Sequence, residues 1–282
     1  MKVLERLEKA PYWALLSLAM NCLLLMAVSL TWEGDRTAKV PTPKSSVLPQ
    51  ANASVATEAA PEATNGLVTA VGDREYFTYQ QWVDLVRQEA QAHADASRLT
   101  VLLGDSISLW FPQELLPGRR TWLNQGISGE KSDMLLRRLD ALDGTQPDTI
   151  FVMVGINDLI AQVPEKSVAQ NLEQSVQYLK QQHPEARIIV QSILPHGAER
   201  ATWEGRDQLL QLPNDRIQAV NTAIANMADA EGVEYLNLYP LFADGEGALR
   251  PDLTTDGLHL SDRGYLVWRT AIALMLNDER DR

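Results

Sequence analysis

The sequence predicts an α/β domain built on a parallel sheet, preceded by an N-terminal membrane-spanning helix and a flexible stalk. The composition is globular, with 45% hydrophobic and 22% charged residues in a chain of 282, which excludes wholesale disorder and coiled coil. From about residue 73, short apolar runs alternate with amphipathic segments. This alternation predicts the α/β domain, and a long uncharged stretch near the N-terminus predicts the membrane helix.

Five short apolar runs are the predicted strands. Strands that are buried on both faces read as continuous apolar runs, and they are typical of a parallel sheet covered by helices on both sides. The sequence therefore predicts a three-layer sandwich around a five-stranded parallel sheet. The runs are Leu99–Leu103, Thr121–Asn124, Thr149–Val154, Arg187–Ser192 and Val233–Leu238.

The segments between the strands show the three- and four-residue spacing of amphipathic helices. Gly144 and Gly232 follow two of these segments, and Pro184 ends another, as residues that terminate helices do. The predicted apolar faces are Met134, Leu135, Leu139 and Leu142; Val168, Leu172, Val176 and Leu179; and Ile217, Val220, Ile224 and Met227.

Residues 11–32 are predicted to form a transmembrane signal anchor. Between Lys9 and Glu33 lie 23 residues without a formal charge, enough at about 1.5 Å per residue to cross a hydrocarbon core of about 30 Å. A cleaved signal peptide is the alternative, because Ala27-Val28-Ser29 loosely resembles a cleavage site. The long uncharged core and the acidic residues before it favour the anchor.

The charge distribution sets the orientation and the domain boundaries. Basic residues precede the predicted span, so residues 1–10 are expected in the cytoplasm and the remainder on the extracytoplasmic side, or secreted if the signal is cleaved. Residues 33–72 are rich in Pro, Ala, Ser and Thr and cannot bury a core, which predicts a disordered stalk. Residues 73–282 form the predicted catalytic domain.

Charge and cysteine content exclude several classes of protein. The chain has 25 Lys and Arg against 37 Asp and Glu, a formal charge of −12, whereas nucleic-acid binders need a basic surface. Cys22 is the only cysteine, so there is neither an intramolecular disulfide nor a cysteine set for a structural metal. The histidines do not pair at metal-ligand spacing. We expect no metal, no cofactor and no nucleic-acid partner, and the sequence predicts no oligomeric state.

Polar residues follow the predicted strands at the edge where ligands bind in such sheets. Ser106 comes just after the first strand, Gly126 after the second and Asn157 after the third, while Asp256 and His259 come after the fifth. A serine, a histidine to take its proton, a carboxylate to orient that histidine and donors for an oxyanion are the components of nucleophilic acyl transfer.

Each of these residues also has an ordinary structural explanation. Ser106 could cap a helix, Asn157 could hold a turn, and Gly126 could serve a backbone with positive φ. Asp256 could be a loop acid and His259 a surface histidine. Their joint position at the ends of predicted strands favours the catalytic interpretation.

Four blocks of this sequence resemble the signature of the SGNH, or GDSL, hydrolase family, over about residues 97 to 276. The wider sequence around the first two blocks looks most like the branch of platelet-activating-factor acetylhydrolase-like and lysophospholipase-like esterases. The blocks are Gly104-Asp105-Ser106, Gly126, Gly155-Ile156-Asn157-Asp158 and Asp256-Gly257-Leu258-His259.

The resemblance implies a flavodoxin-like sheet and assigns a role to each residue. Ser106 would be the nucleophile, His259 the base and Asp256 its partner. The backbone N–H groups of Ser106 and Gly126, with the side-chain amide of Asn157, would form the oxyanion hole. No metal is required by this mechanism.

The leading hypothesis is a membrane-tethered, exported serine esterase that hydrolyses short-chain acyl esters, as an acetylesterase or a lysophospholipase-like enzyme. Its expected substrate is a small-molecule ester or a glycan or lipid ester. An O-acyltransferase that acts on a glycan and a non-catalytic glycan-binding module are the alternatives. Residues 195–213 form an unusually long connection, which is interpreted either as a mobile lid or as a surface loop. His93 and His183 are expected to be solvated, and His196 is a candidate to line the cleft.

Overall fold

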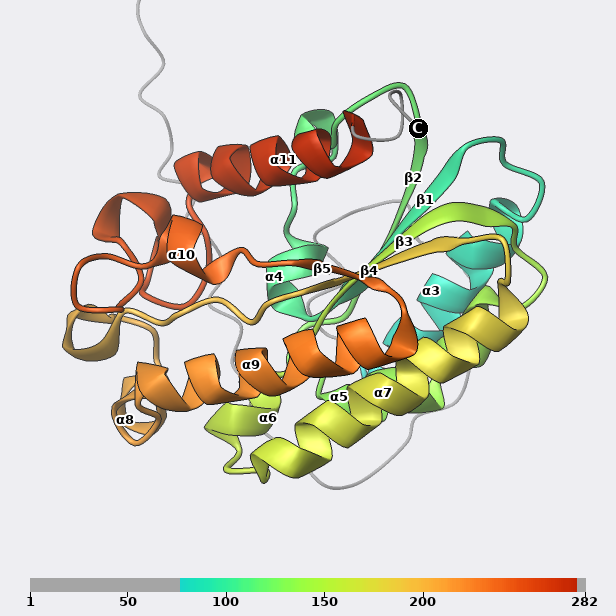
Figure 1. The fold of residues 1–282 in the computed structure, drawn as a ribbon. Helices are drawn as coiled ribbons and strands as arrows, with labels where there is room; N and C mark the ends of the chain where they lie inside the picture. Colours follow the sequence, from blue (N-terminus) through green and yellow to red (C-terminus); the bar gives the residue numbers. More distant parts are fainter. Residues whose placement is uncertain (1–76, 278–282) are drawn as a thin grey trace, which may run out of the picture. The chain divides into compact units, whose positions relative to one another are not determined.

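The computed structural model describes residues 77–277, and within this range five parallel strands form one sheet (Figure 1). The strand order β2-β1-β3-β4-β5 is the flavodoxin-like order, so the predicted five-stranded parallel sheet is confirmed. The predicted anchor and stalk lie outside the described residues. The strands are β1 (Leu99–Gly104), β2 (Thr121–Gly126), β3 (Pro147–Met153), β4 (Arg187–Gln191) and β5 (Glu234–Leu236).

β1 lies between β2 and β3 in the sheet and pairs with both. All six of its residues are buried, which explains why its sequence reads as a continuous apolar run. Gly104 at its end is level with Gly126 of β2 and Met153 of β3. The residues that follow these three strands therefore emerge at one edge of the sheet.

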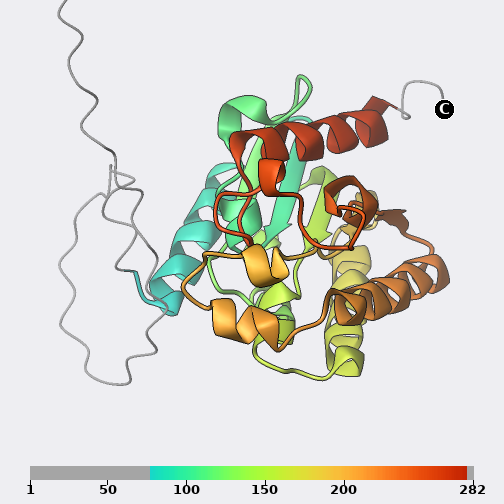
Figure 2. The same ribbon diagram turned by 90° about the vertical axis from the view of Figure 1, so that its left-hand side faces the viewer.

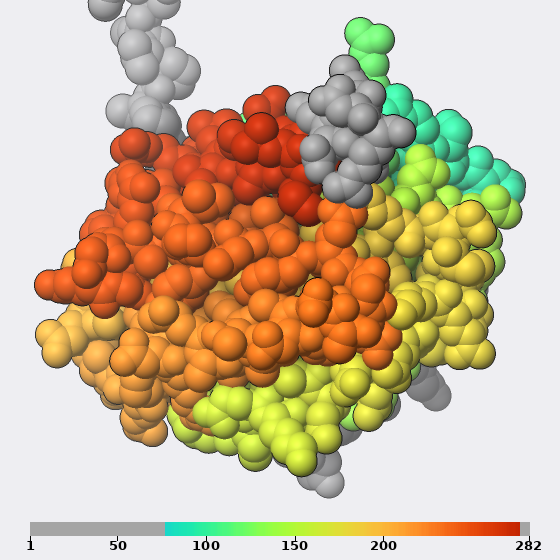
Figure 3. Space-filling view, viewed as in Figure 1, coloured from blue at the N-terminus to red at the C-terminus, as the bar shows by residue number. Residues whose placement is uncertain are grey.

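Helices cover both faces of the sheet (Figures 1 and 2). α11 (Asp262–Asn277) lies on one face, and the other face carries α3 (Tyr79–Ala92), α5 (Ser132–Arg137), α7 (Glu165–Gln182) and α9 (Asn214–Glu231). α7 and α9 pack against each other and appear side by side in the space-filling view (Figure 3). Two of the predicted helical faces, on α7 and α9, are buried as expected.

The third predicted helix is broken. α5 ends at Arg137, and a 3-10 turn, η3 (Leu139–Leu142), follows it. Between them Arg138 leaves helical geometry, with φ −112° and ψ 7°, and its guanidinium lies buried against Glu130. An ion pair with a residue eight positions earlier replaces the next turn of helix.

Short helical elements fill the connections. α4, α6 and α10 lie at or just beyond strand ends, and Figure 1 shows α4 and α6 at the same edge of the sheet. Within residues 77–277, no helix has both the length and the apolar character needed to cross a bilayer. The short elements are α4 (Ser106–Leu109), α6 (Ile156–Ile160), α8 (Arg206–Leu210), α10 (Tyr239–Phe242), η2 (Gln113–Leu115), η4 (Ala198–Arg200) and η5 (Pro251–Leu253).

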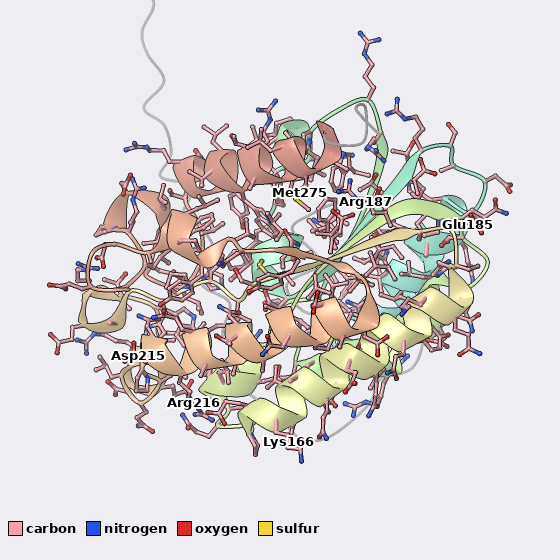
Figure 4. All side chains as sticks on the ribbon, in the orientation of Figure 1. Lys166, Glu185, Arg187, Asp215, Arg216 and Met275 are labelled. Carbon is pink, nitrogen blue, oxygen red and sulfur yellow. The ribbon has the colours of Figure 1, made fainter. Side chains whose placement is uncertain are left out.

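Two hydrogen bonds connect α11 to β4 of the sheet. Trp268 is fully buried, and its indole N–H donates to Gln191 Oε1 at 2.7 Å. At the other end of the helix, Arg187 of β4 reaches the Met275 carbonyl oxygen at 2.9 Å, and Figure 4 shows the two labelled residues together. A buried indole N–H needs an acceptor, so the hydrogen bond from Trp268 to Gln191 fixes the position of α11 on the sheet.

The prediction that His183 is solvated is wrong. His183 caps the C-terminus of α7 and is 6% exposed. Pro184 ends the helix, and the turn that follows folds the ring inward toward the Thr145 backbone. Burial lowers the pKa of His183, so the ring is kept neutral. His93, at the C-terminus of α3, is half-buried.

Candidate active site

Ser106 is the second residue after the end of β1 and the first residue of α4. Asp105 is the N-cap residue of that helix, and its Oδ1 accepts the N–H of Ile107 at 3.0 Å. The capping role that Ser106 might have filled therefore belongs to its neighbour. The Ser106 hydroxyl is directed instead at the ring of His259, with Oγ 3.1 Å from Nε2.

Asp256 and His259 lie in a tight turn, residues 254–260, which we call the acid–base turn. Asp256 Oδ2 is 2.7 Å from His259 Nδ1, and Oδ1 accepts the N–H groups of Leu258 and His259 itself. Burial raises the pKa of Asp256, but the hydrogen bonds from His259 and the two N–H groups outweigh it, so the pKa lies below its usual value. An ionised Asp256 holds the Nδ1–H tautomer of His259, which leaves Nε2 facing serine.

Hydrogen bonds from Thr254 stabilise the acid–base turn, and the ring of Trp110 packs against His259. Thr254 Oγ1 donates to the His259 carbonyl oxygen at 2.6 Å and accepts the N–H of Gly257 at 2.8 Å. The ring of Trp110 lies 4.3 Å from the ring of His259, centroid to centroid, and 41% of Trp110 is exposed. The His259 imidazole is therefore confined between serine, carboxylate and an exposed indole.

Residues 195–213, the β4–α9 segment, support this turn from outside. The N–H of Gly197 donates to the Gly257 carbonyl oxygen at 2.6 Å, and the N–H groups of Thr202 and Trp203 both donate to the Asp256 carbonyl oxygen, at 2.7 and 2.9 Å. The segment also buries apolar side chains in the core. It is thus packed directly against the backbone of the acid–base turn, a role that neither sequence interpretation of it proposed.

Asn157 follows β3, in the first turn of α6, and its amide is held by the loop after β2. Its Nδ2 donates to the Glu130 carbonyl oxygen at 3.1 Å. An amide has two N–H groups, so one remains for another acceptor. Glu130 itself is fixed by the buried ion pair with Arg138, 2.5 Å between Oε2 and Nη2.

Gly126 is explained by close approach of the backbone. A Cβ there would lie 2.4 Å from the backbone nitrogen of Leu109 in α4, so only glycine lets the helix pack on β2. The N–H of Gly126 donates to Asn124 Oδ1 at 3.0 Å. An oxyanion would have to displace that acceptor, and the assignment of Gly126 as an oxyanion donor stays a prediction.

Gly129, which the sequence analysis did not single out, is the other glycine of this loop. It is exposed and has φ +73°, and among the described residues its N–H has no protein acceptor. It directly precedes Glu130, whose carbonyl oxygen holds Asn157. The signal that could have found it is the second glycine in Gly126-Ile127-Ser128-Gly129.

Three carboxyl groups are buried behind the nucleophile. Burial raises the pKa of Asp105 to about 7, and burial also raises the pKa values of Glu130 and Asp158. Arg138 pairs with Glu130, while Asp158 accepts the N–H and the hydroxyl of Ser132 at 2.8 and 2.6 Å. Asp105 therefore retains its proton at pH values where exposed carboxyls are ionised, whereas Glu130 is the ionised partner of Arg138.

A serine after the first strand, with a histidine and a carboxylate brought to it from the C-terminal part of the chain, is the arrangement of serine hydrolases. Among residues 77–277, no group of three or more His, Cys, Asp or Glu side chains is placed to hold a metal ion. The chain belongs to the GDSL-like lipase/acylhydrolase family, whose model matches residues 102–267. The resemblance to SGNH/GDSL hydrolases is thereby confirmed, and the chain is a hydrolase of the esterase and lipase type.

Individual relatives agree with the family. Platelet-activating factor acetylhydrolase IB subunit alpha1 of Homo sapiens is 27% identical over 210 residues, 70% of this chain and 83% of that protein. A Streptococcus pneumonia protein named for platelet activating factor has 29% identity and a TM-score of 0.62, covering 70% of this chain and 94% of that one. A GDSL-like lipase from Bacteroides thetaiotaomicron, 22% identical with a TM-score of 0.56, covers 70% of this chain and 99% of its own and shares the fold.

Proposed function

We propose that this chain is a membrane-tethered serine esterase that removes short acyl groups from a glycan or lipid on the extracytoplasmic side of a membrane. The observation that carries the enzymatic part is the continuous line of contacts from Ser106 Oγ to His259 Nε2, at 3.1 Å, and from His259 Nδ1 to Asp256, at 2.7 Å. These contacts join residues of three types that acyl transfer requires.

In the first half of the reaction, Ser106 Oγ attacks the carbonyl carbon of the ester and its proton passes to His259 Nε2. Asp256 stabilises the imidazolium through the Nδ1–H bond. The tetrahedral intermediate then expels the alcohol oxygen, which takes the proton from Nε2. The products of this half are the free alcohol and the acyl group bound to Ser106.

In the second half, water replaces the alcohol. His259 Nε2 accepts one proton from water as its oxygen attacks the acyl carbon. Collapse of the second intermediate breaks the bond to Ser106 Oγ, which recovers the proton from the imidazolium. The net reaction consumes one ester and one water and yields one carboxylic acid and one alcohol, with Ser106 and His259 restored.

Three donors are proposed for the oxyanion. The N–H of Ser106 has no partner within α4, because the first N–H groups of a helix lie outside its bonding pattern. Asn157 offers its second amide N–H. In place of Gly126, whose N–H already has an acceptor, we propose Gly129 as the third donor, since its loop is bonded to β1 through Ile127 and to Asn157 through Glu130.

The short acyl chain is proposed from the relatives. Those with 27% identity are named as acetylhydrolases of platelet-activating factor, a name that specifies removal of an acetyl group. The formal charge of −12 favours neutral or zwitterionic substrates over polyanions at long range. Both considerations support an acetyl ester as the first substrate to test.

A panel of nitrophenyl esters of increasing chain length, together with acetylated sugars, tests the proposed reaction on the full chain in detergent. We expect the highest kcat/KM with acetate or another short acyl group, and loss of turnover in Ser106→Ala. Labelling of Ser106 by a phosphonate probe should block the activity. A fully active Ser106→Ala variant would refute the proposal. Transfer of the acyl group to an added sugar in preference to water would identify an acyltransferase instead.

The location is proposed from the uncharged stretch between Lys9 and Glu33 and the basic residues before it. The full chain should remain in the membrane fraction at high salt, and protease added from the extracytoplasmic side should release the domain. Recovery of a soluble form whose first residue lies near Leu30 would instead show cleavage of a signal peptide.

A further inference from the structure

The side chain of His196 connects the two ends of the β4–α9 segment by hydrogen bonds. Its ring is 1% exposed and contacts both ends of the segment: Nδ1 is 3.0 Å from the Ala198 nitrogen and Nε2 is 2.5 Å from the Leu212 carbonyl oxygen. A backbone N–H can only donate and a carbonyl oxygen can only accept. The ring must therefore be neutral, with its proton on Nε2.

The main chain of His196 is fixed as firmly as its ring. Its N–H donates to Asn214 Oδ1 and its carbonyl oxygen accepts Asn214 Nδ2, both at 3.0 Å, at the start of α9. The same carbonyl oxygen accepts the N–H of Leu249 at 3.0 Å. Burial lowers the pKa of His196, in agreement with a neutral ring. His196, which follows β4, is thus hydrogen-bonded both to the start of α9 and to Leu249 in the C-terminal part of the domain.

His196 directly precedes the first residue that holds the acid–base turn. Gly197 donates to the Gly257 carbonyl oxygen, and the bond from the Ala198 N–H to His196 Nδ1 shapes the chain on either side of Gly197. Further along, Thr202 and Trp203 donate to the Asp256 carbonyl oxygen. All three N–H groups that hold the turn therefore lie in the stretch from His196 to Leu212, whose two ends the imidazole connects.

We propose that His196 is a positioning residue for the acid–base pair. Through the β4–α9 segment it fixes the main chain of Asp256 and Gly257, and so the direction in which the Asp256 carboxylate meets His259 Nδ1. It touches neither the substrate nor the reacting atoms. This inference rests on the proposed function, because it assigns His196 a role in the same reaction.

The test compares substitutions that remove one or both ring contacts. His196→Asn retains an acceptor at the position of Nδ1 and can keep the Ala198 N–H bond. His196→Gln retains a donor at the position of Nε2 and can keep the Leu212 bond. His196→Ala loses both. His183→Ala is the matched control, because His183 is also buried and neutral but precedes β4, at the opposite edge of the sheet.

Turnover is measured on the full chain in detergent, per mole of Ser106 that reacts with a phosphonate probe, so that misfolded protein does not count. We expect kcat of His196→Ala to fall by about 10-fold to 100-fold with KM within about twofold, since small displacements of catalytic groups cost this much. His196→Asn should recover most of the lost kcat, and His196→Gln should recover less. His183→Ala should lower the melting temperature and keep kcat within about twofold.

Normal kcat per reactive Ser106 in His196→Ala would overturn the inference, as would an equal loss of kcat in His183→Ala. If His196→Ala does not fold, equal kcat values for His196→Asn and His196→Gln would overturn it. The proposed function is tested separately by Ser106→Ala: an inactive Ser106→Ala combined with fully active His196 variants would contradict the positioning role alone.

Discussion

Asp105, directly before the proposed nucleophile, is a fully buried carboxyl whose Oδ1 caps α4. Its pKa is raised by burial to about 7, against about 3.9 in an unfolded chain. Between these values the folded state binds more protons than the unfolded state. The stability that Asp105 contributes is therefore present below about pH 4 and is lost as pH rises to about 7, by up to about 1.4 kcal/mol per pH unit.

Asp105→Asn removes this pH dependence because an amide does not ionise. We expect the free energy of unfolding of the variant, relative to the parent, to increase from pH 4.5 to pH 7 and to stay constant above that. Urea unfolding at several pH values measures the difference. Asp105→Ala should show the same slope but lie about 1 kcal/mol lower at every pH, because it also loses the cap. Parallel curves for Asp105→Asn and the parent would contradict the assignment of a raised pKa.

Asn157 allows a test of the proposed oxyanion contact. Asn157→Ala should reduce kcat by about 10² to 10³ with little change in KM, since a donor to the oxyanion acts mainly in the transition state. Ser106 should still react slowly with a phosphonate. Asn171→Ala is the control, because Asn171 also donates its amide to a neighbour, Ser132 Oγ at 2.9 Å, but from α7.

The alternative for Asn157 is a purely structural role through the Glu130 carbonyl oxygen. In that case the melting temperature of Asn157→Ala falls while the folded fraction keeps normal turnover. Melting temperature and kcat measured on the same purified protein separate the two roles.

The candidate site could be predicted from the sequence as far as side chains of distinctive chemistry follow strand ends. Ser106, Asp256 and His259 were found in this way, and the structure brings them together. The burial of His183 and His196 was not predictable, because a single histidine has no spacing pattern. The support from the β4–α9 segment consists of backbone N–H and carbonyl groups, which leave no trace in the sequence.

At the scale of elements, the strand boundaries were predicted to within about two residues. Burial makes β1, β3 and β4 nearly continuous apolar runs, whereas the edge strands β2 and β5 are partly exposed. The prediction of one continuous helix from Leu135 to Leu142 was wrong. Its apolar spacing is helical throughout, but Arg138 turns inward to pair with Glu130. An ion pair with a residue outside the helix can interrupt a helix that local periodicity favours.

The contact between the β4–α9 segment and the acid–base turn depends on a glycine. Gly257 has φ +91°, and a Cβ there would lie 2.5 Å from Ala201 Cα. Gly257→Ala therefore combines backbone strain with a clash that must separate the two segments. We expect a loss of about 2 to 3 kcal/mol in the free energy of unfolding and a lower kcat.

Gly118→Ala is the control for Gly257→Ala. Gly118 has φ +80° but no atoms near its Cβ position, so its substitution introduces strain alone, of about 1 kcal/mol. Its kcat should be unchanged. Equal losses of stability and unchanged kcat for both variants would show that the close approach of Gly257 to Ala201 contributes to neither stability nor turnover. Denaturant unfolding and kcat are the measurements.

At the scale of the whole molecule, the domain begins before the part that matches the family. The match starts at residue 102, but α3 lies earlier and packs Val86 against Ile127 beneath the sheet. Gln125 Nε2 of β2 also donates to the Val86 carbonyl oxygen at 2.9 Å. A chain reduced to the matching region would leave Gln125 and this apolar surface uncovered.

We predict that a chain beginning at residue 73 folds and keeps the kcat of the full protein, because it retains α3. A chain beginning at residue 98 lacks α3 and should be unstable or insoluble. Expression, melting temperature and esterase turnover of the two truncated proteins measure this. Equal stability of the two would show that α3 is dispensable, and inactivity of the longer one would place the boundary before residue 73.

Ser106 and His259 are 153 residues apart in the chain. Catalysis can therefore begin only after both residues have been synthesised and folded together. A ribosome releases the serine long before the histidine, and α11 follows the histidine in the chain. A chain that ends before His259 cannot place this base beside the hydroxyl. A polypeptide that crosses a membrane unfolded is likewise inert toward esters on the side where it is made. If the proposed export takes place before folding, the enzyme would thus become active only in the compartment where it folds.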